Sequence, residues 1–394
     1  MNIPRIAIVV SHPIHYFCSW YRELARHREW EVMVFFGSAA GAKPYYDSLL
    51  DTQVHWEGLR LESFHHEFLN GDQVVPVDNL LDAVNLGNRL DAFGPDVVLL
   101  HGYAQRMQRR AFLWARRAEK LILMISDAEM KVPRSLLTRA AKRYPLRWLF
   151  RRVNGFLTVG DANEEYYRRY GVDHDRLFRN PFPIDWDLYD AALIQRETLR
   201  AEFRARYSIA PDGIVCACVG KFEPRKAQGD ILQALSHPEV RGLGIVLFLA
   251  GSGKTEQVLK SMVSPGGTAQ VIFPGFVPPV ELPGLYAATD IYVQPSQKDP
   301  HPLAITEAVA MGCPVVASSA VGSVGPTDDV QPDRNGLVYP AGDTAGLASA
   351  LARLARNPTL RDSFGAASRE ISAENSRLAR GEGLRAALTA LGLF

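Results

Sequence analysis

Short apolar runs alternate with amphipathic stretches along the whole chain, and this alternation limits the possible folds more than any other feature of the sequence. The predicted strands are residues 5–10, 31–36, 97–101, 121–126 and 155–159 in the first half, and 214–219, 244–250, 270–273, 291–294, 314–318 and 336–339 in the second. Continuous apolar strands separated by helices are typical of parallel sheets covered on both faces. The pattern therefore predicts an α/β protein with two doubly wound, Rossmann-like domains that face a central cleft.

The 394 residues are enough for two or three domains, each with its own core. From Asn180 the pattern changes to Asn-Pro-Phe-Pro-Ile-Asp-Trp-Asp and then to a charged helix. We therefore expect an N-terminal domain at 1–185, a linker at 186–205 and a C-terminal domain at 206–370. The remaining stretch, 371–394, is helical in pattern, and it either caps the second domain or crosses back to the first.

Composition indicates an ordinary globular protein. Apolar residues make up 47% and charged residues 22% of the chain, and the net charge of +1 gives no reason to expect nucleic acid. No apolar run reaches eighteen residues and the first residues resemble a strand rather than a signal peptide, so we expect a cytoplasmic protein. The four cysteines fit neither a disulfide framework nor a metal motif, and Cys216 and Cys218 are expected to be core thiols.

Two acids, Asp299 and Glu307, lie eight residues apart across the predicted start of a helix. Pro302 suits the first helical position, and the predicted strand at 291–294 makes the unit one strand, loop and helix of a crossover. The first N–H groups of such a helix, at 303–305, form an anion site that suits a sugar diphosphate. Helix electrostatics alone also favour an acid near a helix start, so a purely structural role stays open at this point.

Two lysines five residues apart follow the first strand of the second half. Lys221 closes the strand and Lys226 approaches the next helix, so both are able to reach one anionic group, such as a diphosphate leaving group. The alternative is a solvated turn. The nearby Gly-Ser-Gly-Lys segment ending at Lys254 is not a P-loop, because Phe248 occupies the position of its first glycine. We interpret that segment as a strand-to-helix turn.

Taken in order, the motifs of the second half resemble those of glycosyltransferase family 4. They are Val219-Gly-Lys221 with Lys226, Leu249-Ala-Gly-Ser-Gly253, Phe273-Pro-Gly-Phe-Val-Pro-Pro279, Leu285-Tyr-Ala-Ala-Thr-Asp290, Asp299 with Glu307-Ala-Val-Ala-Met-Gly312, and Asn335-Gly-Leu-Val-Tyr-Pro340. A weaker resemblance in the first half rests on Ser11-His-Pro-Ile-His-Tyr16, 97–103 and 159–167. The resemblance implies a GT-B fold, retention of anomeric configuration and no metal or other cofactor.

The resemblance also implies a role for each matching residue. Lys221 and Lys226 would hold the diphosphate of a nucleoside-diphosphate sugar, Glu307 would bind the ribose hydroxyls, and the turn containing Gly275 and Val277 would border the base. Asp299, His301 and Leu303 would lie against the donor sugar. The family usually has glutamate where this chain has Asp299, and often an aromatic residue where it has His301. Both departures lie at positions expected to contact the donor sugar, so they bear on which sugar is used.

In the first half, Ser11-His-Pro-Ile-His15 replaces the glycine-rich loop that is common in the family. His12 and His15 are therefore candidates for the donor phosphate or the acceptor, and the alternative is that they are hydrogen-bonded structural groups. His101 ends its strand beside Gly102 and matches a histidine that relatives place against the donor sugar or acceptor hydroxyl. Asp127 is a candidate of the same kind, or else a helix N-cap.

The segment 131–152 holds eight basic residues and no acid, interleaved with aromatic and aliphatic side chains. It predicts either contact with the anionic inner face of the cell membrane, next to a lipid-linked acceptor, or a helix whose arginines stay in water. No reading motif accompanies the charge, so nucleic acid is not expected.

The sequence thus predicts a hexosyltransferase-type, retaining glycosyltransferase that moves a sugar from a nucleoside-diphosphate sugar to a sugar or lipid-linked acceptor in bacterial glycoconjugate assembly. Two alternatives stay open. One is a non-catalytic scaffold or binding protein with the same fold, and the other is a sugar-nucleotide epimerase or phosphorylase, because fold does not fix chemistry.

Overall fold

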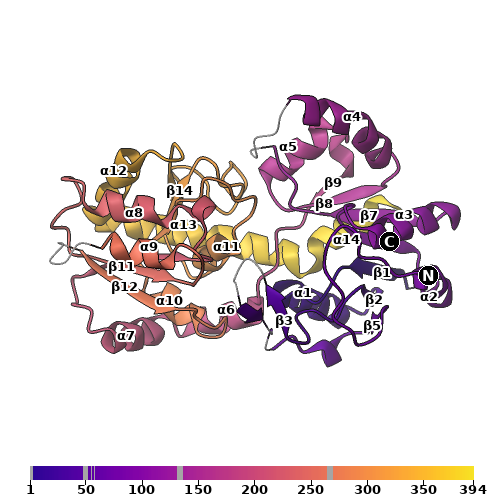
Figure 1. Cartoon of the computed structure of the whole chain (residues 1–394), viewed down its shortest axis with the longest axis horizontal. Helices are drawn as coiled ribbons and strands as arrows, with labels where there is room; N and C mark the ends of the chain where they lie inside the picture. Colours follow the sequence, from indigo (N-terminus) through magenta and orange to yellow (C-terminus); the bar gives the residue numbers. More distant parts are fainter. Residues whose placement is uncertain (1–2, 48–51, 55, 57, 131–135, 264–268) are drawn as a thin grey trace.

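The computed structural model describes residues 3–47, 52–54, 56, 58–130, 136–263 and 269–394. Two α/β domains lie side by side (Figure 1), each built on a parallel sheet. The strand order is β5-β2-β1-β6-β7-β8-β9 in the N-terminal domain and β12-β11-β10-β13-β14-β15 in the C-terminal domain. The predicted fold class, two doubly wound domains, is confirmed.

All eleven predicted strands are present, with ends that differ from the prediction by at most two residues. They are β1 (Arg5–Val10), β2 (Glu31–Phe36), β6 (Val97–His101), β7 (Leu121–Ile125), β8 (Gly155–Thr158), β10 (Ile214–Val219), β11 (Ile245–Ala250), β12 (Gln270–Gly275), β13 (Ile291–Gln294), β14 (Val315–Ser318) and β15 (Gly336–Tyr339). The prediction missed β5 (His66–Phe68), β9 (Leu177–Arg179) and the β3–β4 hairpin (Tyr45–Asp47, Thr52–Val54). These four strands have three residues each, which is too few to show a periodic pattern of apolar side chains.

The helices cover both faces of each sheet because one side of each is apolar. In the N-terminal domain they are α1 (His15–Arg26), α2 (Leu86–Phe93), α3 (Arg106–Arg117), α4 (Leu136–Phe150) and α5 (Asp161–Arg169). The others are α6 (Trp186–Ile194), α7 (Arg196–Arg206), α8 (Gln228–Leu235), α9 (Glu256–Ser261), α10 (Leu282–Ala288), α11 (Leu303–Ala310), α12 (Thr344–Ala355), α13 (Pro358–Arg377) and α14 (Gly383–Ala390). Within the described ranges, no helix combines the length and apolar character needed to cross a membrane.

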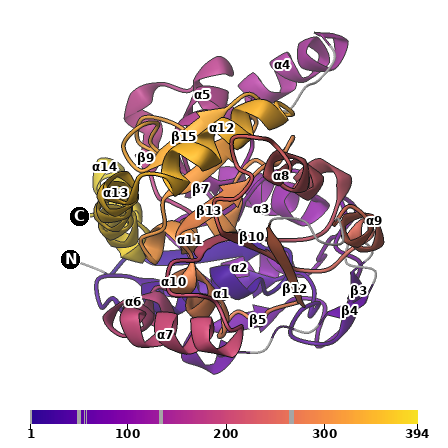
Figure 2. The same cartoon turned by 90° about the vertical axis from the view of Figure 1, so that its left-hand side faces the viewer.

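The chain crosses between the domains twice. The first crossing leads from β9 into α6, and the second is the long helix of the C-terminal tail, which leaves the C-terminal domain as α13 and continues as α14 against β8 and β9 (Figures 1 and 2). Between α13 and α14 a π-helical turn, Leu378–Glu382, contains Gly381 at φ 137°. Arg380 in this turn donates to Glu23, Asp187 and Asp190, so the turn is tied to α1 and α6 at the crossing.

The crossover β13–α11–β14 forms as predicted, with β13 and β14 as parallel neighbours. The helix begins one residue later than expected: Pro302 is its N-cap, at φ −73° and ψ 109°, and not its first helical residue. The N–H of Ile305 donates to the Pro302 carbonyl at 2.9 Å. The predicted anion site at 303–305 therefore reduces to the N–H groups of Leu303 and Ala304, which have no intrahelical partner at a helix start.

Candidate active site

The candidate residues follow neighbouring strands at the carboxyl edges of both sheets. In the N-terminal domain β1, β6 and β7 are adjacent, so the loop containing His12, the end residue His101 and the loop containing Asp127 share one edge. In the C-terminal domain β10 pairs with β13, and the loops that follow them contain Lys226 and Asp299. Ligands of open α/β sheets bind at such edges.

Lys226 and Asp299 form a direct ion pair. Lys226 Nζ donates to Asp299 Oδ2 at 2.5 Å, and the Asp299 side chain is only 7% exposed. Ser296 Oγ and Gln294 Nε2 also donate to Oδ2, at 3.2 and 3.4 Å. All three contacts reach the same oxygen, so none of them occupies Oδ1, and the partly buried Lys226 lies beside it with two further N–H donors.

The loop that contains Lys221 is held by close backbone packing. The N–H of Phe222 donates to the Ser252 carbonyl at 2.8 Å, and a Cβ at Gly251 would lie 2.0 Å from the Gly220 oxygen. Gly251 and Gly253 have φ values of 145° and 147°, which favour glycine. The Gly-Ser-Gly segment is thus a strand-to-helix turn between β11 and α9, as predicted, and it supports the lysine loop.

Glu307 lies on α11, where Tyr286 Oη donates to its Oε2 at 2.8 Å. Burial raises the pKa of Glu307 to about 7, against the lowering effect of this hydrogen bond. The described contacts of Glu307 are separate from those of Asp299. The two acids of the motif therefore have different surroundings, because Asp299 pairs with Lys226 and Glu307 accepts a hydrogen bond from Tyr286.

The turn predicted to border the base begins at the end of β12. Gly275 has φ 79° and its carbonyl accepts a hydrogen bond from the N–H of Gly251, while Val277 packs against the domain core. Between them, Phe276 is 59% exposed. The sequence prediction passed over Phe276, although an aromatic residue in a turn expected to face a base was a usable signal.

His301 is held by two side chains at the boundary of the domains. Its Nδ1 lies 3.1 Å from Ser323 Oγ and its Nε2 lies 3.6 Å from Asp329 Oδ2. Burial lowers the pKa of His301, while Asp329 and Asp127 oppose that shift. The ring also faces Phe182, with centroids 4.9 Å apart. Leu303, two residues later, packs against the cores of both domains.

His101 lies within a cluster of aromatic rings. Its Nε2 is 3.0 Å from Tyr21 Oη, and the rings of Phe17 and Trp20 lie around it. Burial lowers the pKa of His101 to about 3. The imidazole is therefore neutral at physiological pH and is able to accept or donate one hydrogen bond without bringing charge.

His12 and His15 are also neutral. Burial lowers the pKa of each to about 4, and for His15 the effect is opposed by Asp185. Ser11 Oγ lies 2.8 Å from His12 Nδ1. The ring of His15 lies against the ring of Trp56, with centroids 4.6 Å apart.

Asp127 is not the N-cap of a helix, because residues 128–130, which follow it, are not helical. More than a third of the residue is accessible, yet enclosure between the domains raises the pKa of its carboxyl group, with His301 opposing and Asp299 adding to the shift. Electrostatic coupling therefore links Asp127 of one domain to the donor-side residues of the other.

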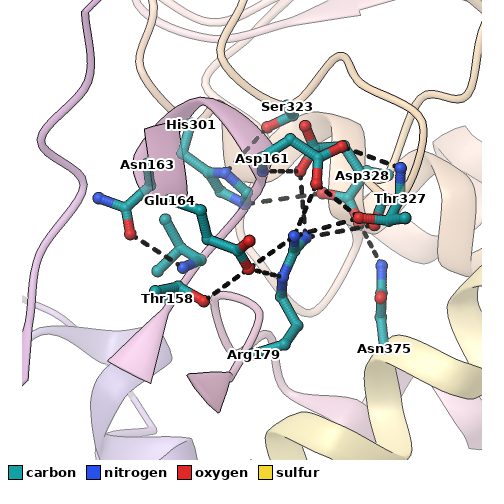
Figure 3. Close-up of polar contacts among 12 residues, drawn as sticks. Thr158, Asp161, Asn163, Glu164, Arg179, His301, Ser323, Thr327, Asp328 and Asn375 are labelled. Carbon is teal, nitrogen blue, oxygen red and sulfur yellow. Dashed lines mark hydrogen bonds and ion pairs between the residues drawn. The ribbon is translucent and has the colours of Figure 1, made fainter. Parts of the chain in front are cut away.

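The structure brings Lys226 and Asp299 into direct contact, and it places His301 and Asp127 close enough to Asp299 for an electrostatic effect on their pKa values. His12, His15 and His101 lie in the N-terminal domain, as Asp127 does, and share no described contact with the Lys226–Asp299 pair. Sequence reasoning missed a second interdomain cluster around Arg179, shown in Figure 3. No motif spacing signals it, because its partners lie about 150 residues away in the chain, at 327 and 328.

The basic segment 131–152 is only partly described. Residues 131–135 lie outside the described ranges, and from there the segment forms α4 and a turn. Leu146 and Phe150 are buried, whereas Tyr144 and Trp148 are 80% and 51% exposed. The helix thus packs one face on the domain and presents aromatic rings beside arginines on the other. This agrees with both alternatives stated for the segment.

In the part of the chain that the structure describes, no group of three or more histidine, cysteine, aspartate or glutamate side chains is placed to hold a metal ion.

The C-terminal domain matches a known family. Residues 200–371 match the model described as glycosyl transferases group 1. The chain is 31% identical over 219 residues to a GDP-mannose-dependent alpha-(1-6)-phosphatidylinositol monomannoside mannosyltransferase of Mycobacterium tuberculosis, covering 54% of this chain and 52% of the relative. It is 32% identical over 251 residues to a D-inositol 3-phosphate glycosyltransferase of Saccharomonospora viridis, covering 55% and 57%. The chain spans about half the length of these relatives.

Similarity to solved structures extends over both domains. The crystal structure of HepE from Anabaena in complex with UDP and glucose superposes with a TM-score of 0.70 and 16% identity, covering 98% of this chain and 100% of HepE. At this identity the likeness shows the fold alone. Two parallel-sheet domains in this arrangement constitute the GT-B fold that the motifs implied.

Proposed function

Since its C-terminal domain is that of a group 1 glycosyltransferase and its two domains have the GT-B fold, we propose that this chain is a retaining, nucleotide-sugar-dependent glycosyltransferase. The observation that carries the proposal is the buried Lys226–Asp299 pair beside the N-terminus of α11. Charge compensation and a carboxylate for sugar hydroxyls thus occur together at the edge where nucleotides bind in such sheets.

In this proposal, different residues bind different parts of the donor molecule. Lys221, Lys226 and the N–H groups at the start of α11 neutralise the departing diphosphate, Asp299 and His301 orient the sugar, and Glu307 accepts from the ribose. Phe276 lies in the turn expected to border the base, with its ring exposed. No covalent intermediate on the protein is required, because the acceptor attacks from the face that the diphosphate leaves. The rate enhancement comes from positioning and electrostatics.

The acceptor hydroxyl is presented by the N-terminal domain. His101 is neutral, and its Nε2 lies 3.0 Å from Tyr21 Oη, which fixes the ring. Its other nitrogen, Nδ1, would orient the hydroxyl without competing with the lysines for the diphosphate. Closure of the domains around both substrates excludes water that would hydrolyse the donor. No metal or other cofactor enters this mechanism.

The donor is tested by thermal stabilisation. A ligand that binds only the folded state raises the melting temperature by mass action, so UDP-, GDP- and ADP-sugars are compared, with GDP-mannose and UDP-glucose included because of the relatives and the HepE complex. The stabilising donor is then incubated with candidate acceptors, and the products are identified. Nucleoside diphosphate released in step with a new glycosidic bond supports transfer. Binding without turnover would indicate a scaffold, and an altered sugar without release of nucleoside diphosphate would indicate an epimerase.

We also propose that the enzyme works in the cytoplasm against the inner face of the membrane, through the exposed rings and arginines of α4. Each basic residue near an anionic surface contributes about 1 kcal/mol. The exposed rings would add the apolar part of the contact, so co-sedimentation with phosphatidylglycerol vesicles should fall several-fold when Tyr144 and Trp148 are both replaced by serine. Neutral phosphatidylcholine vesicles are the control, and equal sedimentation of the variant and the parent protein would contradict membrane contact by this face.

A further inference from the structure

Where the two domains meet, one guanidinium joins acidic groups of both. Arg179, at the end of β9, donates through Nε to Glu164 Oε1 at 2.9 Å and through Nη2 to Asp161 Oδ1 at 2.7 Å. Its Nη1 reaches across to the C-terminal domain, 3.3 Å from the Thr327 carbonyl and 3.5 Å from Asp328 Oδ1 (Figure 3).

In the C-terminal domain, Thr327 donates two hydrogen bonds to Asp161 of the N-terminal domain. The N–H of Thr327 donates to Asp161 Oδ2 at 2.9 Å, and Thr327 Oγ1 donates to Asp161 Oδ1 at 2.5 Å. In the other direction, the N–H of Asp161 donates to Asp328 Oδ1 at 2.9 Å. Because Asp161 is the first residue of α5, Asp328 caps that helix from the opposite domain, where an anion is favoured.

The contact is closely fitted. A Cβ at Gly160 would lie 2.4 Å from Asp328 Oδ1, and one at Gly325 would lie 2.3 Å from Asp161 Oδ2. A side chain at either position would displace the carboxylate that it meets, and with it the hydrogen bonds of that carboxylate across the contact.

The next residue, Asp329, faces the donor side instead. Its Oδ2 accepts from Thr306 Oγ1 at 2.7 Å and lies 3.6 Å from His301 Nε2, and its Oδ1 accepts from Asn375 Nδ2 at 2.8 Å. The carboxylate is almost fully buried and connects the start of α11 with α13.

A single loop, 322–330, contains all of these contacts. The N–H of Val330 donates to the Ser323 carbonyl at 3.0 Å, so the loop is closed at its base, and Ser323 Oγ lies against the other nitrogen of His301. The two ends of the loop therefore lie on either side of the imidazole, with Ser323 Oγ within hydrogen-bonding distance of Nδ1 and Asp329 Oδ2 at 3.6 Å from Nε2, while the tip at 327–328 lies on the N-terminal domain.

We propose that the 322–330 loop couples the contact between the domains to the donor-sugar side of the cleft, with Asp329 as the positioning residue for His301 and for the start of α11. The inference rests on the proposed function, since it concerns how that site is assembled. Asp329 acts through His301 and Thr306 and touches no substrate. When the domains separate, Thr327 and Asp328 lose their partners, and the loop no longer fixes the imidazole.

The charges around Asp328 agree with this role. Burial raises the pKa of Asp328 to about 7, with a further increase from Asp161 and Asp329 and a decrease from the N–H of Asp161 and from Arg179. In separated domains the carboxyl group is hydrated and has its ordinary, lower pKa. Ionisation of Asp328 therefore weakens the contact as pH rises through about 7. Asp161 acts in the opposite direction, because Thr327 and Arg179 lower its pKa against the effect of burial, so its protonation weakens the contact at low pH.

The test compares Thr327→Val with Thr327→Ser. Valine has the shape of threonine without the hydroxyl, and serine keeps the donor to Asp161. We expect kcat to fall roughly 10- to 100-fold in Thr327→Val and in Asp329→Asn, as for other small misplacements of reacting groups, with the Kd for nucleoside diphosphate within about twofold of the parent value. Thr327→Ser should restore kcat. Asp333→Asn is the matched control, because Asp333 is an exposed acid on the segment that follows and has a positive φ that asparagine accepts.

Hydrogen exchange without ligand supplies a readout that does not depend on activity. In Thr327→Val the amides of residues 301–306 should exchange faster than in the parent protein and in Asp333→Asn. Exchange that changes only at 323–330 and 160–164, or a kcat in Thr327→Val equal to that of the parent, would overturn the coupling. If the parent protein neither binds nor transfers any nucleotide sugar, the proposed function fails, and the exchange result still decides whether the loop couples the domains to α11.

Discussion

The candidate residues of the two domains differ in charge. The wall of the C-terminal domain contains Lys226 in a buried ion pair and a helix N-terminus. The wall of the N-terminal domain contains His12, His15 and His101, whose pKa values burial lowers to about 4, 4 and 3. At physiological pH these three imidazoles add no positive charge to the cleft.

In the proposed function, this difference would divide the work between the domains. A leaving diphosphate needs fixed positive charge, which Lys226 and the start of α11 would supply. An acceptor hydroxyl needs a directed hydrogen bond in surroundings without a competing cation, which neutral histidines among aromatic rings would supply. Histidines are thus kept neutral by the same packing that orients them.

The largest effect is expected from Lys226→Ala. The substitution removes the cation beside the diphosphate and leaves the Asp299 carboxylate buried without its partner, so turnover should fall by roughly two to three orders of magnitude. Release of nucleoside diphosphate at saturating donor and acceptor measures it. Lys298→Ala, an exposed lysine next to Asp299, is the control. Near-normal transfer by Lys226→Ala would mean that the positive charge of Lys226 is not needed to stabilise the leaving diphosphate.

His101→Phe tests the neutral wall. Phenylalanine keeps the aromatic packing and loses the ring nitrogens, and a hydrogen bond to a group that develops charge is worth about 1.5–3 kcal/mol, so kcat should fall roughly 10- to 100-fold. Donor affinity, measured by calorimetry, should not change. His66→Phe is the matched control, because His66 also lies among aromatic rings of the same sheet. A loss of donor affinity equal to the loss of kcat would mean that the N-terminal wall binds the donor as well.

The smallest effect is expected from Glu307→Gln, which should weaken nucleotide binding about tenfold with the fold retained, because a neutral amide accepts the ribose hydroxyls less strongly than a carboxylate. The pKa of Glu307 is about 7, so the affinity of the parent protein should rise as pH increases from 6 to 8, while that of the variant stays level. Calorimetry at several pH values measures both.

Thermal unfolding without ligand reports the raised pKa of Glu307 independently of nucleotide binding. Its folded pKa lies above its ordinary value, so the ionised form is disfavoured in the folded state, and the parent protein should lose stability relative to Glu307→Gln as pH rises through 7. If Glu307→Gln binds the nucleotide with the same affinity as the parent protein, Glu307 does not bind the ribose hydroxyls.

Much of the fold was predictable because it depends on local patterns. Buried parallel strands are continuous apolar runs, and all eleven predicted strands are present. The three-residue strands β3, β4, β5 and β9 were missed because such short segments have no period to detect. The start of α11 was wrong by one residue because proline suits both the N-cap and the first helical position.

The candidate site was predictable only where its residues belong to motifs. The spacing of Lys221, Lys226, Asp299 and Glu307 identified them, yet it gave no sign that Lys226 pairs with Asp299 while Glu307 is bound by a tyrosine of α10. Pairing is decided by which strands are neighbours, and β10 lies beside β13 only in the folded sheet.

The sequence by itself determined the two doubly wound domains, the likeness of the C-terminal domain to group 1 glycosyl transferases and the candidate residues for the donor, because strand periodicity, turn chemistry and motif spacing are local properties. Tertiary structure alone decided that the histidines of the N-terminal wall are neutral, since their pKa depends on burial by residues from many elements. It also decided that Arg179 and Asp161 meet Thr327 and Asp328. That contact joins segments about 150 residues apart, and only the approach of two folded domains brings them within hydrogen-bonding distance.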